Sequence, residues 1–340
     1  MIQESLEQEA VVGNTGVFTL SLDFELIWGT LDLFGPDRFR EACLRERALI
    51  DPLLDLFTEF EIPATWCVLG HLFLGSCESG DGKKHPEISE PHHDWCRQGW
   101  FAHDPCSTEE AEPIFYGRSL VNKIMQCKVQ QEIGCHSFSH VIFGDDGCSE
   151  ETAESELAAC LKLAEERNID MVSFAFPRNR VGHLPLLEQF GFRVFRGPDA
   201  VWYEQGNRSG WIRRLFHLWD VVRAAQPPVV LPKRITKQLW DVPGSMIYFP
   251  MHGFRRWLPL SWRVSRAIKG LNAAVRQKKV FHLWFHPTNL ADQSERMFAG
   301  LRQIFEQVRM LRENGMLTVL PMRSLVPEEI TVTIPNETRQ

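Results

Sequence analysis

Hydrophobic residues follow two spacings along the chain, one typical of buried strands and the other of amphipathic helices. Short apolar runs rich in β-branched and aromatic residues predict strands at 17–22, 63–69, 130–135, 171–176, 191–195, 245–249, 280–285 and 316–320. Apolar residues spaced three and four apart predict helices at 38–60, 117–127, 149–168 and 291–314. Ser149, which precedes an acid-rich first turn, is the predicted N-cap of the third helix. This alternation of strands and helices predicts a parallel sheet with helical crossovers.

No glycine-rich phosphate-binding motif opens any of these helices, which disfavours a nucleotide-binding doubly wound sheet. The architecture that remains is a closed or distorted β/α barrel. In such barrels the chemistry gathers at the carboxyl ends of the strands. Five polar residues would lie at that end: Asp23, Glu25, His136, Arg178 and His286.

Two carboxylates end the first predicted strand. Asp23 and Glu25 are two residues apart, so both side chains leave on the same face if the strand continues that far. Two acids that point together repel each other, and a bound cation is the usual remedy. A pair of solvated carboxylates is the plainer interpretation.

His136 and His140 change this interpretation, because two histidines four residues apart can converge on one ion. With one carboxylate they make an open three-ligand site, which resembles catalytic zinc sites whose remaining position holds water. A histidine pair at this spacing is common by chance. Its combination with the strand-end acids is what indicates a metal site.

Several segments resemble the polysaccharide deacetylase family, also called carbohydrate esterase family 4 or the NodB homology domain. The string His-Ser-Phe-Ser-His at 136–140 fits the family's His-Ser/Thr-x-x-His motif, and the acids at the end of the first strand resemble its Asp-Asp motif. Residues 64–70 look like its second strand. Residues 280–287 resemble its late motif, an apolar strand ending in His, with Trp284 where Leu is usual. The order along the chain agrees, and the likeness spans about residues 16–322.

The resemblance implies a distorted (β/α) barrel of the polysaccharide deacetylase type over residues 16–325. The expected flanking segments are an N-terminal tail at 1–15 and a C-terminal tail at 326–340. The periodic pattern breaks from about 71 to 116, a length that suggests a functional insertion or lid. A second metal site in this insertion is an alternative without a diagnostic spacing, and its candidate ligands are His71, His85, His92, His93, His103, Cys77, Cys96 and Cys106.

The resemblance also assigns roles to the residues at the carboxyl ends. Glu25, His136 and His140 would hold a divalent metal, with zinc the expected ion. Asp23 would be the base and His286 the acid. The two acids are adjacent in the family, whereas Phe24 separates them here, so Asp23 as the metal ligand remains an alternative.

Two further assignments have structural alternatives. The family usually has an arginine shortly before Pro177 that orients the base, and this chain has apolar residues there. Arg178 is the predicted substitute, and a surface arginine is the alternative. A histidine that ends an apolar strand, such as His286, is often only a hydrogen-bonded core residue. His282 lies further back on the same face and is predicted to be structural.

Composition fits a large globular protein of the cytoplasm. The chain has 340 residues, 44% of them hydrophobic, enough for a sizeable core. There is no apolar run of the length of a transmembrane helix and no signal-peptide pattern at the N-terminus. Nine cysteines without a Cys-x-x-Cys pair argue against a disulfide framework and a zinc ribbon, so a reducing compartment is inferred.

Charge is divided unevenly along the chain. Residues 205–280 hold 15 lysines and arginines against two acids, although the net charge of the chain is −7. This segment lacks a nucleic-acid motif, so phosphate-bearing sugars or an anionic membrane surface fit better than nucleic acid. Within it, 211–223 is predicted as an amphipathic helix with tryptophans on one side, as an interfacial helix or an ordinary core helix would have. A basic face that pairs with the acidic remainder of the protein is the plainer alternative.

Together these features predict a metal-dependent hydrolase that removes an acetyl group from an N-acetylated sugar, either lipid-linked or phosphate-bearing. It would act during the biosynthesis of a surface polysaccharide or glycoconjugate, in the cytoplasm or at the inner membrane surface. A noncatalytic carbohydrate-binding or scaffold protein on the same fold is the alternative, because the acid and arginine motifs depart from the family pattern.

Overall fold

Strand β1 (Gly16–Phe24) is the centre of the sheet, and all nine of its residues are buried. The computed structural model describes residues 13–327 except 81, 97 and 200–224. On one side β1 pairs in parallel with β9 (Val280–Phe285) along most of its length. On the other side its first residues pair with β10 (Leu317–Val319) and its last residues with β2 (Thr65–Val68). The mostly apolar run at 17–22 thus belongs to a central strand that is buried on both faces.

The sheet curls from β1 in both directions. Parallel pairing runs from β2 through β3, β4, β5 and β7, β6 joins β7 in the antiparallel direction, and β8 pairs with β9 at the other edge. An isolated bridge between Val230 and Val280 brings the segment before β6 back to β9, so the circle is completed only in part. The predicted distorted β/α barrel is therefore confirmed. The bounds of these strands are β3 (Glu132–Cys135), β4 (Ser173–Ala175), β5 (Val194–Arg196), β6 (Lys233–Arg234), β7 (Trp240–Asp241) and β8 (Met246–Ile247).

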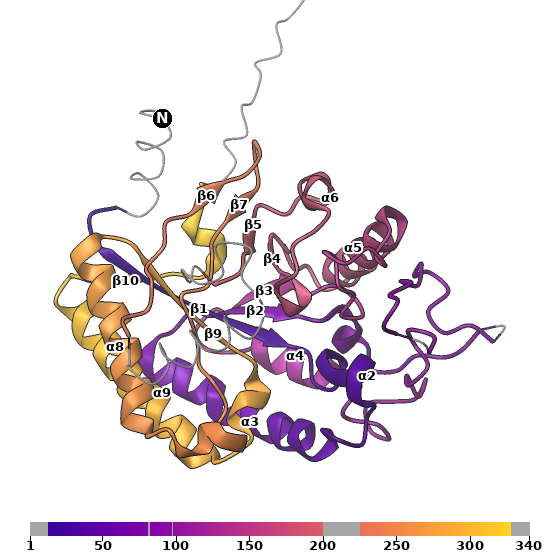
Figure 1. Ribbon diagram of the computed structural model, residues 1–340, viewed down its shortest axis with the longest axis horizontal. Helices are drawn as coiled ribbons and strands as arrows, with labels where there is room; N and C mark the ends of the chain where they lie inside the picture. Colours follow the sequence, from indigo (N-terminus) through magenta and orange to yellow (C-terminus); the bar gives the residue numbers. More distant parts are fainter. Residues whose placement is uncertain (1–12, 81, 97, 200–224, 328–340) are drawn as a thin grey trace, which may run out of the picture.

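Helices cover the outside of the sheet. Figure 1 shows α3, α8 and α9 lying together beside β1 and β9, and α8 contacts both β1 and α9. Phe305 of α9 packs against Phe18 of β1 and Phe57 of α3, with ring centroids 6.4 and 5.9 Å apart. The α-helices are α2 (Trp28–Phe34), α3 (Arg40–Phe60), α4 (Arg118–Met125), α5 (Glu150–Glu165), α6 (Leu184–Gln189), α8 (Leu260–Gln277) and α9 (Ser294–Glu313). Short 3-10 helices are η1 (Gly70–Phe73), η2 (Pro177–Asn179), η3 (Gly253–Trp257), η4 (Pro287–Leu290) and η5 (Met322–Leu325).

The strands and helices predicted from periodicity all occur within a few residues of their predicted bounds. Ser149 is the N-cap of α5, and its hydroxyl accepts the Thr152 N–H at 3.1 Å. Helix α8 was not predicted, and its buried face combines Arg263 and Arg266 with Val264, Leu271 and small residues. The amphipathic helix predicted at 211–223 lies outside the described residues.

The insertion is irregular over its described residues, which carry neither a helix nor a strand between Leu74 and Gly117. Isolated bridges, such as the one between Ser76 and Thr108, hold it locally. It begins after η1, which is joined to the loop after β3 by two backbone hydrogen bonds: Gly70 N–H to Ser137 O at 2.8 Å and His71 N–H to Phe138 O at 2.9 Å.

Part of the basic segment at 205–280 is turned inward. The Arg263 guanidinium is buried and donates to the Leu258 carbonyl oxygen at 2.9 Å. Arg266 is also buried and donates to the Ala225 carbonyl oxygen at 3.2 Å. These two charges are therefore used within the chain. In the described part of the protein, no helix is long and apolar enough to cross a membrane.

Candidate active site

Glu25, His136 and His140 meet where β1 and β3 end. Glu25 directly follows β1, and His136 directly follows β3, which lies two strands away in the same parallel sheet. Because the carboxyl ends of parallel strands reach the same edge, these side chains converge although 111 residues separate Glu25 from His136. The Glu25 Oε2 atom lies 3.0 Å from His136 Nε2 and 3.2 Å from His140 Nε2. All three residues are buried.

The donor atoms of this cluster fit a divalent cation. The His136 Nδ1–H donates to the Ala175 carbonyl oxygen at 2.8 Å, which leaves Nε2 as the nitrogen that faces Glu25. Burial alone would raise the pKa of Glu25, but the charges of His286 and His140 and hydrogen bonds from His136 and His140 outweigh it and hold the pKa well below its usual range. An ionised carboxylate and two imidazole nitrogens that aim at one point are a typical three-ligand set for zinc.

Glu156 of α5 holds the loop that carries the two histidines. Its buried Oε2 accepts the N–H groups of Phe138 at 2.7 Å and of Ser139 at 2.8 Å, and the Ser139 hydroxyl donates to Oε1. This fixes a turn in which His140 has a φ of 67°, a conformation that few side chains adopt without support. The sequence showed Glu156 only as one acid of an acid-rich helix, so its role was missed.

Asp23 is held by an arginine that the sequence analysis also missed. Arg196, the last residue of β5, donates from Nη1 to Asp23 Oδ1 at 2.8 Å and from Nη2 to Oδ2 at 2.5 Å. Burial would raise the pKa of Asp23, but the charge and hydrogen bonds of Arg196 together with the charges of His136 and His286 outweigh it and lower the pKa below its usual value. Asp23 is therefore an ionised carboxylate in a two-point clamp.

Three further side chains fix the Arg196 guanidinium. It lies 4.2 Å from the ring centre of Trp284, and its Nη1 also donates to the Ser21 hydroxyl oxygen at 3.1 Å. The Ser21 Oγ lies 2.8 Å from His282 Nε2, while His282 Nδ1 faces the carbonyl oxygens of residues 242 and 243. Burial lowers the pKa of His282 to about 3, so this ring is neutral and holds the Ser21 hydroxyl in place. His282 thus acts as a positioning residue, in line with its predicted structural role.

The prediction that Arg178 orients Asp23 is wrong in its geometry. Arg178 lies in η2, and its guanidinium forms an ion pair with Asp32 and lies 5.1 Å from the Trp95 ring centre. The orienting contact comes instead from Arg196, on the next strand of the sheet. Arg178 therefore contacts α2, through Asp32, instead of Asp23.

His286 completes the site at the end of β9. Its Nε2 lies 3.5 Å from Glu25 Oε1 and 3.7 Å from Asp23 Oδ2, and its side chain is 28% exposed. A cavity of about 510 Å³ opens here, lined by Glu25, His286 and residues of α2, α3 and η4. Its volume lies within the range of small-molecule sites, which is about 300–1,000 Å³. His286, which is partly exposed, thus lies between the buried carboxylates and the open cavity.

Comparison with solved structures identifies the fold. A polysaccharide deacetylase from Mycobacterium smegmatis, described as putative, aligns with a TM-score of 0.60 at 14% identity, over 92% of this chain and 90% of that chain. A probable polysaccharide deacetylase from Pseudomonas aeruginosa PAO1 aligns with a TM-score of 0.56 at 10% identity, over 91% and 89%. A GH57-type branching enzyme from Pyrococcus horikoshii aligns with a TM-score of 0.50 at 9% identity, over 91% and 69%.

The chain therefore has the fold of the polysaccharide deacetylases, as the sequence motifs predicted. At these identities the likeness establishes the fold alone. No family model and no curated protein matches the sequence.

Proposed function

We propose that this chain is a metal-dependent hydrolase that removes the acetyl group from an N-acetylated sugar. The observation that carries the proposal is the convergence of Glu25, His136 and His140 beside Asp23 and His286. This set combines an open three-ligand metal site with an ionised carboxylate and a partly exposed histidine. Amide hydrolysis needs these parts: activation of water, stabilisation of an oxyanion and protonation of the departing amine.

Each side chain has a role that follows from its contacts. Glu25, His136 and His140 would hold a divalent ion, with zinc expected from this ligand set, and the bound ion would supply activation of water and polarisation of the amide carbonyl. Asp23 accepts the proton of the attacking water, because Arg196 and the neighbouring histidines lower its pKa and favour the ionised form. His286 donates a proton to the amine nitrogen as the carbon–nitrogen bond breaks. The products are acetate and a free amino sugar.

Glu25 is the better candidate for the metal ligand than Asp23. Both oxygens of Asp23 accept hydrogen bonds from Arg196, whereas Glu25 Oε2 faces the two histidines. The intervening Phe24 is buried and edge-on to Trp66, with ring centroids 5.9 Å apart. Glu25 therefore reaches the histidines from the position just after β1. In the family the two acids are adjacent, whereas here Phe24 separates them.

The site does not favour the glycosidic chemistry suggested by the branching-enzyme likeness. Glycoside hydrolysis uses a pair of carboxyl groups, one of which stays protonated as the acid. Here burial of both Asp23 and Glu25 is outweighed by charged neighbours, and the pKa of each carboxyl is lowered. Neither is suited to hold a proton at neutral pH. The noncatalytic alternative was based on the acid and arginine motifs, which depart from the family pattern. Glu25 and Arg196 supply an acid and an arginine at the site, which removes much of the support for that alternative.

The substrate proposal is an N-acetylated saccharide of surface polysaccharide or glycoconjugate biosynthesis, in the cytoplasm or at the inner membrane face. It is supported by the deacetylase fold and by the cavity beside His286. Only the basic segment at 205–280 supports a lipid-linked or phosphate-bearing form of this substrate. Cosedimentation with anionic and neutral vesicles at low and high salt checks it, and equal, negligible binding to both would leave an unanchored saccharide as the substrate.

Metal content and acetate release test the proposal. We expect the purified protein to release acetate from N-acetylated oligosaccharides, and His136→Ala and His140→Ala each to lose the ion of this site while the fold is retained. Loss of a three-ligand site should reduce activity to background. His92→Ala is the matched control, because His92 is exposed on the insertion. Unchanged metal content and activity in the His136 and His140 variants would refute the ligand set.

A further inference from the structure

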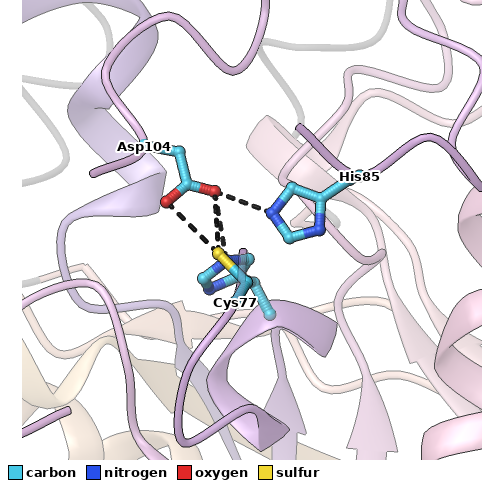
Figure 2. Close-up of side chains that lie close together, drawn as sticks. Cys77, His85 and Asp104 are labelled. Atoms are coloured by element: carbon cyan, nitrogen blue, oxygen red, sulfur yellow. Dashed lines mark hydrogen bonds and ion pairs between the residues drawn. The ribbon is translucent and has the colours of Figure 1, made fainter. Parts of the chain in front are cut away.

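A second group of metal-ligating side chains lies in the insertion. His71, Cys77, His85 and Asp104 each offer one ligand atom, and these four atoms all lie within 4.8 Å of one another. His71 comes from η1, and the other three come from the irregular segment that follows it. Figure 2 shows the thiol of Cys77 and the ring of His85 directed at the carboxylate of Asp104. The group is distinct from the Glu25 cluster and shares no residue with it.

The separations suit four ligands around one ion. Ligands bound to zinc tetrahedrally at about 2.0–2.3 Å lie about 3.3–3.8 Å from one another. The Asp104 Oδ2 atom lies 3.4 Å from His71 Nε2 and 3.7 Å from Cys77 Sγ. Its 2.7 Å separation from His85 Nε2 has the length of a hydrogen bond, which these two residues would exchange for bonds to the ion.

Each of the two histidines is oriented by its other ring nitrogen. The His71 Nδ1–H donates to the Phe115 carbonyl oxygen at 3.1 Å, so Nε2 carries the lone pair that faces the cluster. The Nδ1 of His85 lies 3.5 Å from Glu87 Oε1. A carbonyl or carboxylate behind the imidazole is the usual arrangement for metal-binding histidines.

Asp104 and Cys77 are supported in the same way. The Cys106 N–H donates to Asp104 Oδ1 at 3.0 Å, which leaves Oδ2 for the cluster. The Tyr116 hydroxyl lies 3.2 Å from Cys77 Sγ, where it can donate to a thiolate. Three of the four candidate ligands therefore have a hydrogen-bond partner outside the group, and the Glu87 carboxylate lies behind the fourth, His85.

The cluster is incompletely satisfied without an ion. His71 is fully buried, and its Nε2 has no hydrogen-bond partner among the described residues. Buried polar atoms of this kind are rare and require an explanation. Because the Phe115 carbonyl oxygen accepts the Nδ1–H, the lone pair on Nε2 is available. A cation at the centre of the group would use this lone pair.

We propose that His71, Cys77, His85 and Asp104 bind a second divalent cation, zinc, which has a structural role. A thiolate with two imidazoles selects zinc over the hard cations magnesium and calcium. Four protein ligands close the coordination shell and leave no position for water, as in structural zinc sites. Cys77 and Asp104 supply two negative charges, so the buried assembly is neutral, whereas the Glu25 cluster would leave one positive charge on its ion.

The ion would fix the insertion against the loop that carries the catalytic histidines. The rings of His71 and His85 both contact Phe138, with centroid distances of 5.8 and 5.2 Å. Trp100, also in the insertion, donates from Nε1 to the Ser139 hydroxyl oxygen at 2.8 Å. Phe138 and Ser139 lie between His136 and His140 in the sequence. An irregular segment of this length gains most from such a cross-link.

Cobalt substitution separates this site from the active site. The full-length His136→Ala/His140→Ala variant, which lacks the catalytic ligands, is stripped with a chelator under reducing conditions and titrated with Co²⁺. We expect about one ion per chain and the charge-transfer absorption of a cobalt–thiolate bond. Cys77→Ser in the same background should lose that absorption, and His85→Ala should weaken cobalt binding at least tenfold. Failure of the proposed hydrolase activity would leave these results unaffected.

Two cysteines serve as matched controls. Cys96 lies in the insertion outside the group, and its thiol donates to the Gln98 carbonyl oxygen at 3.3 Å. Cys106 is the neighbour of Cys77 and interacts with its thiol. Cys96→Ser and Cys106→Ser should both keep the ion and the absorption. The proposal is overturned if the folded double variant binds no cobalt, or if the absorption survives Cys77→Ser or disappears in Cys106→Ser.

Limited proteolysis gives a second readout. We expect the apo protein to be cut within 74–117 at least tenfold faster than the zinc-loaded protein, and Asp104→Asn to behave like the apo form with or without zinc. Equal cleavage rates for the apo and loaded wild-type protein would contradict a structural role for the ion.

Discussion

At the scale of single residues, the clearest feature is the division of labour between two acids at the end of β1. Asp23 faces Arg196, whereas Glu25 faces the histidines. We expect Asp23→Asn to keep the metal and to lose activity by about 10²–10⁴-fold, the usual contribution of a general base. Acetate release and metal content of the same preparation check this. If the ion leaves with the substitution, Asp23 is the ligand and the two roles must be exchanged.

The two-point contact between Arg196 and Asp23 leads to a second prediction. Lysine keeps the positive charge but cannot make two parallel hydrogen bonds. We expect Arg196→Lys to let the carboxylate rotate and to lower kcat by about 100-fold, since small displacements of a catalytic group are that costly. Arg178→Lys is the matched control and should change kcat far less, because Arg178 pairs with Asp32. The reverse order of effects would restore the orienting role predicted for Arg178.

The difference between the residues that could and could not be predicted has a physical cause. His136 and His140 lie in one short loop, so their relation is visible in the sequence. Arg196 is 173 residues from Asp23, and only the pairing of β4 with β5 brings its side chain to the site. No local pattern around Arg196 marks it. Arg178 was chosen because it lies next to a recognisable proline, which says nothing about where its guanidinium points.

At the scale of elements, α5 and the loop after β3 act as one unit through Glu156. Burial raises the pKa of Glu156 to about 7, despite the three hydrogen bonds that it accepts. Because the folded pKa exceeds the unfolded value, this group's contribution to stability is complete below about pH 4.5 and is lost as the pH rises through 7. A shift of this size corresponds to on the order of 3 kcal/mol.

Glu156→Gln should remove this pH dependence. A glutamine can still accept the two loop N–H groups and can donate to the Ser139 hydroxyl oxygen, so it resembles the protonated acid. We expect the free energy of unfolding of wild type to fall between pH 5 and pH 8 more than that of the variant. The difference, variant minus wild type, should therefore rise over this range. Denaturant titrations at both pH values measure it. Glu154→Gln, at an exposed position of the same helix, is the control and should show no such trend. A parallel pH response of the Glu156→Gln variant and wild type would contradict the prediction.

Periodicity identified the elements whose buried faces are apolar and failed where the buried face is not. Helices α3 and α9 have the expected spacing of large apolar residues, and α5 carries the predicted N-cap, Ser149, and an acid-rich first turn. The buried face of α8 also contains two arginines beside Val264, Leu271, a glycine and alanines, and buried arginines do not count toward a hydrophobic pattern. These arginines are tolerated because backbone carbonyls accept their hydrogen bonds. The same contacts reduce the charge that the segment at 205–280 can offer to a membrane or a phosphate.

At the scale of the whole molecule, the residues that pack on α9 and the acids of the site lie at opposite ends of β1. Its first residues pack against α9 beside β10, and its last residues carry the two acids. The alternation of strands and helices predicted a parallel sheet with helical crossovers, and the lack of a glycine-rich phosphate-binding motif left a barrel as the expected architecture. The partial closure through Val230 was not predictable, because it rests on a single bridge and a two-residue strand. Such short pairings follow from the assembled barrel rather than from a local preference.

The separation of the two ends can be tested with Phe305, which is fully buried in α9 between β1 and α3. We expect Phe305→Ala to lower the free energy of unfolding by about 3–5 kcal/mol, because it removes a large side chain and leaves a cavity. Metal content and kcat per folded molecule should be unchanged, since Phe305 packs on Phe18 near the start of β1, away from Asp23. Met310→Ala on the exposed side of the same helix should cost within about 0.5 kcal/mol. Denaturant unfolding and activity assays on the same samples decide the matter. If Phe305→Ala reduced metal binding in the folded fraction, the core and the site would be coupled through β1, and the strand would have to be treated as one unit from its first residue to its acids.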